Sequence, residues 1–225
     1  MIIYNGLSKK KFKEKKCAIA IGNFDGLHLG HNKVLKKAQL EAKEKKLKFG
    51  VVTFEPVPVM FFNKKIKYHR INNYDQKISA LKSLNLDFLL IIRFDRKFSN
   101  YKPINFIKKI IFQFLRSKLV FISENFRFGK NREGGISTLK ENEKIFFYKT
   151  KVINPLKKNY KTLSSTLIRK EISKGNIKKV NKLLGRNWSI IGKVIKGDKR
   201  GRVIGFPTCN IELKNYVLPK LGVYG

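Results

Sequence analysis

The feature that most constrains this chain is a regular alternation between short apolar stretches and longer segments with helical periodicity. The apolar stretches have the length of strands and lie at 17–21, 49–54, 88–92 and 119–122. Helical segments are expected from about His31 to Ala42, at 75–84 and from Pro103 to about Arg116. Strands that alternate with helices favour a parallel sheet covered on both faces. We therefore predict an α/β fold with its ligand beyond the carboxyl ends of the strands, in the loops after residues 21, 54 and 122.

The pattern changes after Thr150, which indicates a second part of the chain. Two short helices are expected, one at 164–174 that ends at Gly175 and one at 177–184. From Trp188 onward, glycines separate strand-like stretches at 190–195, 203–206 and 217–224. We therefore predict one domain over residues 1–186 and a smaller unit over residues 187–225.

The formal net charge of +36 is typical of a protein that binds nucleic acid or anionic lipid. However, the lysines recur along the whole chain, and their runs lack the interleaved aromatic residues of a single-strand groove. The apolar segment at 104–115 is too short to span a membrane. Cys17 and Cys209 lack the spacing of a disulfide framework or a zinc site. We expect a cytoplasmic protein with no specific nucleic acid and no membrane partner, whose positive field attracts small polyanions.

The strongest candidate site is the sequence GNFDGLHLGH at 22–31, which follows the first apolar stretch. His28 and His31 lie on one face where a helix begins, and unpaired N–H groups there favour an anion. A loop histidine that merely caps the helix is the competing explanation. Glycines allow the backbone to approach a phosphate closely. The predicted phosphate loop comprises His28 and His31 as catalytic residues, with Gly22, Phe24, Asp25, Gly26 and Gly30.

Two further segments carry residues suited to anions. In SSTLIR at 164–169, hydroxyl groups at a helix start precede an arginine, although a plain N-cap explains the serines as well. In the loop at 125–132, two arginines accompany two phenylalanines, which suits a phosphate beside an aromatic ring, although core phenylalanines are the alternative. His69 lies outside any motif and is expected at the surface. The candidates are Ser164, Ser165, Thr166 and Arg169 in the first segment and Asn125, Arg127, Phe128 and Arg132 in the second.

These segments resemble the HxGH nucleotidyltransferases, and GNFDGLHLGH is close to the version in bacterial bifunctional riboflavin kinase/FAD synthetases. TFEPVP at 53–58 is similar to that family's TFEPHP stretch, with Val57 in place of the usual histidine. SENFRFG at 123–129 is similar to its flavin-side loop, with Ser123 where glycine is common. SSTLIR matches its nucleotide-binding signature, and LLGR at 183–186 matches the junction before the kinase half. The resemblance covers essentially the whole chain and implies a Rossmann-like nucleotidyltransferase domain.

The resemblance implies an FMN adenylyltransferase, or FAD synthetase, which transfers AMP from ATP to FMN and releases pyrophosphate. It makes residues 22–31 and 164–166 the ATP side and the candidates at 125–132 the flavin side. His28 and His31 are then donors to the ATP phosphates, Arg169 holds the nucleotide and Asn125 aligns the reacting phosphates. Mg²⁺ is expected with ATP, although no acidic cluster announces a metal site built from protein alone.

The segment at 192–210 resembles the start of a riboflavin kinase domain, a small β-barrel, with Cys209 where the family has alanine. The resemblance assigns Mg-ATP binding there to Gly197, Gly201, Thr208 and Asn210. The barrel continues well beyond this segment in the family, so we expect an incomplete barrel without kinase activity of its own, whereas the full-length parent phosphorylates riboflavin. An HxGH enzyme for another substrate, or a basic RNA-binding protein, is the alternative. The oligomeric state stays open.

Overall fold

The computed structural model describes residues 1–8, 12, 16–154, 157–158, 161–197 and 205–224. A six-stranded sheet in the order β1-β4-β3-β2-β5-β6 forms its centre, and every pairing in it is parallel. The strands are β1 (Ile2–Asn5), β2 (Cys17–Ile21), β3 (Lys48–Glu55), β4 (Phe88–Arg93), β5 (Ser117–Ser123) and β6 (Lys149–Ile153). The predicted α/β class and parallel sheet are confirmed.

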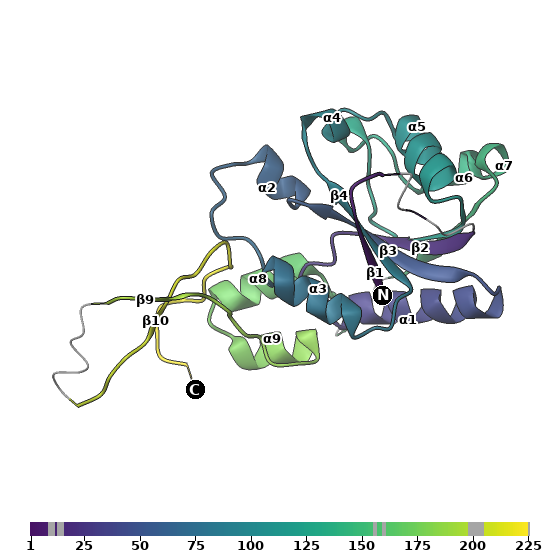
Figure 1. The fold of residues 1–225 in the computed structure, drawn as a ribbon. Coiled ribbons are helices and arrows are strands. Elements are labelled where there is room, and N and C mark those ends of the chain that lie inside the picture. Colours follow the sequence, from purple (N-terminus) through teal and green to yellow (C-terminus); the bar gives the residue numbers. More distant parts are fainter. Residues whose placement is uncertain (9–11, 13–15, 155–156, 159–160, 198–204, 225) are drawn as a thin grey trace.

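Helices cover both faces of the sheet (Figure 1). On one face, α1 (Leu29–Glu44) and α3 (Tyr74–Lys82) bury apolar residues against Ala18 and Ala20 of β2. On the other face, α5 (Pro103–Phe106) and the π-helix η1 (Ile107–Phe114) pack against Ile19 and Ile21. The connections after β2 and β5 lead in opposite directions along the sheet. Ligands of such sheets bind outside the carboxyl ends of the strands at this switch point, where the loops after residues 21 and 122 lie.

Several elements differ from the sequence prediction. The helix expected from Pro103 to about Arg116 is mostly a π-helix, and the N–H of Leu115 bonds to the carbonyl of Ile110, five residues back (2.9 Å). The prediction missed both edge strands, β1 and β6. It also missed five short helices: α2 (Pro58–Phe62), α4 (Arg96–Ser99), the 3₁₀ helix η2 (Lys130–Arg132), α6 (Ile136–Glu141) and α7 (Glu143–Phe146).

The last part of the described chain packs against the first. The predicted helices are present as α8 (Ser165–Ser173) and α9 (Ile177–Leu184), and they form a small core with Ile71, Trp188 and Val217. The indole Nε1 of Trp188 donates to the carbonyl of Ile71 (2.9 Å). A hydrogen-bonded bridge joins Arg70 to Tyr216. Residues 188 and 216–217 therefore share contacts with the segment that precedes α3.

The strand predictions beyond Trp188 are only partly correct. The described strands there are β9 (Val194–Ile195) and β10 (Asn210–Ile211), which pair in antiparallel fashion, and Figure 1 shows them projecting away from the sheet. A further short pair consists of β7 (Lys157–Lys158) and β8 (Lys161–Thr162). The stretch at 217–224 is not a strand, because Tyr216 makes a single bridge and no ladder continues it. Residues 203–204 lie outside the described residues. No helix in the described part of the chain is long and apolar enough to cross a membrane.

Candidate active site

The loop between β2 and α1 turns sharply before the helix begins. Gly26 has a φ of 80°, a conformation that favours glycine, and a Cβ there would lie 2.9 Å from Cδ1 of Ile71. Phe24 and Leu27 also have positive φ values, of 49° and 36°, and both side chains are buried in the core that contains Leu35 of α1. Packing thus holds an unfavourable backbone conformation in place, which is common at functional sites.

The two histidines of the loop lie against each other at the start of α1. His28 is the N-cap residue of α1, as the competing explanation expected, and its Nδ1 atom accepts a hydrogen bond from the backbone N–H of His31 (3.3 Å). The two rings stack with their centroids 3.7 Å apart. Burial lowers the pKa of His28 to about 4 and holds the pKa of His31 well below its ordinary value. Both imidazoles are therefore neutral near pH 7. Because Nδ1 of His28 is an acceptor, its proton lies on Nε2, which becomes a neutral donor.

Asp25 connects this loop to two other parts of the chain. Its carboxylate accepts hydrogen bonds from the N–H groups of Ile71 (3.2 Å) and Asn72 (3.5 Å). It also pairs with Nη2 of Arg169 at 2.5 Å, and the Asp25 side chain is only 5% exposed. A buried carboxylate requires such partners. Both residues were predicted on the ATP side, and the structure pairs them with each other.

Helix α8 brings the second predicted segment to the same loop. Ser164 caps the helix and accepts from the N–H of Leu167 (3.2 Å), whereas the Ser165 hydroxyl donates to the carbonyl of Asp25 (2.9 Å). Thr166 is exposed. Ser164 is thus a plain N-cap, as the alternative explanation held. The Ser165 hydrogen bond nevertheless joins α8 to the loop at 22–31. The predicted sets at 22–31 and 164–169 lie together.

Two arginines are held by backbone carbonyls around this site. Arg169 donates through Nε to the carbonyl of His69 (2.7 Å). Arg186 donates to the carbonyls of Gly26 (2.7 Å) and Leu27 (3.1 Å). His69, which the sequence placed at the surface, is half-buried instead. Arg186 was predicted only as part of a junction motif, because the carbonyls that accept its hydrogen bonds have no sequence signature.

An ion pair next to the loop was not predicted at all. Arg70 forms a bidentate pair with Glu55 at the end of β3, and one of its two hydrogen bonds measures 3.2 Å. Val57, where the related family usually has histidine, is 3% exposed and lies at the start of α2. An apolar side chain there cannot donate a hydrogen bond to a ligand. The TFEPVP stretch therefore contributes Glu55 to the charge around the site and Val57 to the core.

The predicted flavin loop follows β5 at the same sheet edge. Asn125, Arg127 and Arg132 are exposed, whereas Phe128 is buried in the core and stacks on Phe126 with centroids 5.5 Å apart. Phe128 also bridges to Gly134 through two backbone hydrogen bonds. The core explanation therefore applies to Phe128, while the polar residues of the loop face solvent.

The described part of the kinase segment includes β9 and β10, which lie away from the sheet in Figure 1. Gly197 is beside Asn210 of β10, since a Cβ on Gly197 would lie 1.7 Å from Nδ2 of Asn210. Thr208 is exposed. Gly201 lies outside the described residues. Within the described ranges, no group of three or more histidine, cysteine or acidic side chains is placed to hold a metal ion.

Comparison with known proteins identifies the family. Residues 10–167 match the family model described as FAD synthetase. The chain belongs to the FAD synthetase family. Residues 184–225 also match the model described as riboflavin kinase, so the predicted resemblance to bifunctional enzymes is confirmed.

Curated relatives extend over the whole chain. It is 38% identical over 225 residues to the bifunctional riboflavin kinase/FMN adenylyltransferase of Buchnera aphidicola subsp. Schizaphis graminum, and the match covers 100% of this chain and 72% of the relative. The Escherichia coli K12 protein of the same name is 34% identical over 211 residues, which is 94% of this chain and 67% of the relative. A crystal structure described as a macrolide-efflux protein from Streptococcus pneumoniae has a TM-score of 0.84 and 27% identity, and it covers 100% of this chain and 73% of its own. The description of that structure names a different activity, which belongs to that protein.

Proposed function

We propose that this FAD synthetase family member transfers AMP from ATP to the phosphate of FMN and releases pyrophosphate. The observation that carries the proposal is the convergence of the loop at 22–31 and the segment at 164–169 around the start of α1. The relatives named as FMN adenylyltransferases support the choice of FMN as the acceptor. The positive charge of the chain favours the approach of both polyanionic substrates.

The histidines have the geometry of neutral donors in this proposal. The Nε2–H of His28 would donate to an ATP phosphate oxygen at the start of α1, where the helix dipole and free N–H groups also favour negative charge. The His31 ring stacks on His28, and the backbone N–H of His31 donates to Nδ1 of His28, so residue 31 fixes the orientation of the His28 donor. No protein nucleophile is needed, because the phosphate of FMN attacks the α-phosphorus. Catalysis then consists of alignment and stabilisation of charge on the transferred group.

The remaining residues would hold the two substrates. Arg169 is oriented by Asp25 and by the carbonyl of His69, which leaves Nη1 for the nucleotide. Asn125 is exposed in the loop that follows β5 and would align the reacting phosphates, with Arg127 and Arg132 on the flavin side. Mg²⁺ would enter with ATP and neutralise phosphate oxygens.

We further propose that the 225 residues do not phosphorylate riboflavin by themselves, and that the chain divides at 186/187 into adenylyltransferase and kinase parts. The four residues of β9 and β10 are all exposed, and an isolated two-stranded ladder is at best marginally stable. Gly197, Thr208 and Asn210 would then serve Mg-ATP binding only within a complete barrel. A cytoplasmic location, with its ATP and flavin supply, suits these reactions.

The test supplies FMN and Mg-ATP to the purified protein and measures FAD and pyrophosphate. We expect FAD from the wild type, with CTP and riboflavin as inactive replacements for ATP and FMN. His28→Ala and His31→Ala should abolish turnover while the circular dichroism spectrum stays unchanged. Near-wild-type turnover in both variants would contradict the proposal.

A further inference from the structure

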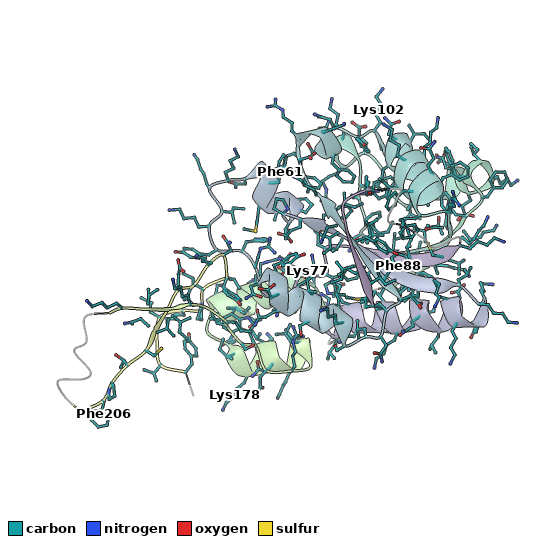
Figure 2. The ribbon with its side chains drawn as sticks, viewed as in Figure 1. Phe61, Lys77, Phe88, Lys102, Lys178 and Phe206 are labelled. Atoms are coloured by element: carbon teal, nitrogen blue, oxygen red, sulfur yellow. The ribbon has the colours of Figure 1, made fainter. Side chains whose placement is uncertain are left out.

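A buried lysine lies next to the phosphate loop and has no role in the mechanism above. Lys77 is on α3, and only 4% of it is exposed. Figure 2 places it in the interior of the view, whereas Lys102 and Lys178, both exposed, lie at the edge of the molecule. Lysine is almost never fully buried unless it is paired. Its burial therefore requires a reason.

The surrounding charges do not supply a direct partner. Lys77 lies within electrostatic reach of Glu55 at the end of β3 and of Asp25 in the phosphate loop. Each carboxylate is already paired with an arginine: Glu55 with Arg70, and Asp25 with Arg169. Among the described residues, Lys77 makes no hydrogen bond or ion pair. The side chain of Lys77 is thus largely buried, and arginines pair with the nearby acids.

The charges around the loop leave an excess of positive charge. Arg70, Arg169, Arg186 and Lys77 are cations, whereas Asp25 and Glu55 are the carboxylates beside them. Arg186 bonds to carbonyls and to the side chain of Asn72, so it neutralises neither acid. Four positive charges face two negative charges in a largely buried region. Such an excess is costly without an anion, and the site therefore suits a multiply charged ligand.

Lys77 lies on the nucleotide side of the sheet. It is close enough to His31 to help lower the pKa of that imidazole. Its neighbour Ile78 belongs to the same core as Phe24 and Leu27 of the phosphate loop. Phe126 and Phe128 of the flavin loop pack on the opposite face, with α5 and η1.

We propose that the Lys77 ammonium binds the polyphosphate of the nucleotide, and specifically the oxygens that leave as pyrophosphate. This inference rests on the proposed function. The ammonium would neutralise charge that develops on the leaving group as the bond between the α-phosphorus and its bridging oxygen breaks. The anion in turn would supply the partner that the buried lysine lacks.

Burial lowers the pKa of Lys77 to about 8. The groups that face it are the carboxylates of Asp25 and Glu55, the guanidinium of Arg70 and the neutral imidazole of His31. The imidazole of His31 stays neutral between pH 7 and pH 9, because burial holds its pKa well below its ordinary value. The contribution of Lys77 to anion binding should therefore be large at pH 7 and should decline as the pH rises past 8.

The decisive experiment measures binding of inorganic pyrophosphate, ATP and FMN separately by calorimetry in the presence of Mg²⁺. Lys77→Met removes the charge and keeps an unbranched side chain. Lys82→Met, at an exposed position in the last turn of the same helix, is the matched control. We expect Lys77→Met to weaken pyrophosphate and ATP binding on the order of 10- to 100-fold at pH 7, as for loss of a charge-assisted hydrogen bond. FMN binding should stay unchanged, and the wild-type advantage over Lys77→Met should shrink at pH 9.

A structural role for Lys77 makes a different prediction. If Lys77 serves only to neutralise the charge of Asp25 and Glu55, Lys77→Met should lower Tm and should weaken the binding of pyrophosphate, ATP and FMN to the same extent. Under the proposal, Tm should stay the same or rise, because a buried charge is removed. Unchanged pyrophosphate affinity, a loss confined to FMN, or a uniform loss with a lower Tm would each overturn it. Absence of FAD synthesis by the wild type would instead refute the proposed function, and pyrophosphate binding would still be measurable.

Discussion

Replacement of Asp25 by asparagine should test whether the site is assembled by its central ion pair. The Asp25 carboxylate is 5% exposed and the paired Arg169 side chain is 19% exposed. Asp25→Asn keeps an oxygen that can accept from the N–H of Ile71, but it leaves the guanidinium without a counterion. Loss of one member of a buried pair costs about 3–5 kcal/mol. Because water partly reaches Arg169, we expect the lower end of this range, about 3 kcal/mol of unfolding free energy.

Urea unfolding followed by circular dichroism measures this loss. For a chain of this size, about 3 kcal/mol corresponds to a decrease in Tm of roughly 6–12 °C. The slope of free energy against urea should stay constant if the fold is otherwise preserved. Glu212→Gln is the control, because the Glu212 pair with Lys214 (3.2 Å) is exposed to solvent. That variant should change the free energy of unfolding by no more than about 0.5 kcal/mol.

A double-mutant cycle isolates the pair from its surroundings. Arg169→Met leaves the Asp25 carboxylate without its counterion. The double variant Asp25→Asn/Arg169→Met removes both charges, so no unpaired charge remains. We expect the loss in the double variant to fall short of the sum of the single losses by at least about 1 kcal/mol. Additive losses, or a loss below about 1 kcal/mol for Asp25→Asn alone, would refute the reasoning.

Three further predictions concern packing, pH and the contact between the two parts of the chain. Gly50→Ala should destabilise the protein by about 1–3 kcal/mol in urea unfolding, because a Cβ there would lie 2.2 Å from Phe88; an unchanged midpoint would contradict the packing. The pKa of His28 is lowered from its ordinary 6.5 to about 4, so the unfolded chain binds the proton more tightly than the folded chain does. The free energy of unfolding should therefore fall by up to about 3 kcal/mol as the pH drops from 6.5 through 4. Equal pH slopes for wild type and His28→Gln in urea titrations would count against this assignment. Tyr216→Phe removes the hydroxyl that bonds to Gln76 (2.8 Å) and should cost about 1 kcal/mol, whereas Tyr224→Phe, at an exposed position, should cost less; the reverse order in thermal melts would disprove this contact.

The central strands of the fold could be predicted because burial on both faces leaves continuous apolar runs. β2 reads CAIAI and is fully buried. The edge strand β6 reads KTKVI, and it was not predicted because its exposed lysines interrupt the apolar run. The π-helix η1 has the composition of a buried α-helix, so its sequence does not distinguish its hydrogen bonds from those of an α-helix.

Some residues of the candidate site could likewise be predicted from the sequence, and others could not. Motif residues such as His28 and Ser164 could be found because their types and spacing suit phosphate chemistry. Their partners were missed where the partner is a backbone group, as with the carbonyls that hold Arg186, since every residue has one. Lys77 was missed because a lysine in a lysine-rich chain carries no signal until its burial is known.

Backbone atoms of the segment at 69–72 bind both Asp25 of the phosphate loop and Arg169 of α8, so these contacts depend little on the side chains of the segment. The carbonyl of His69 accepts from Arg169, and Ile71 donates its N–H to Asp25 and accepts from Trp188. Every amino acid offers the same carbonyl, and only proline lacks the N–H. Residue 69 can therefore be substituted without loss of the carbonyl that accepts from Arg169. A single inserted or deleted residue in the segment would instead shift all of them out of register at once.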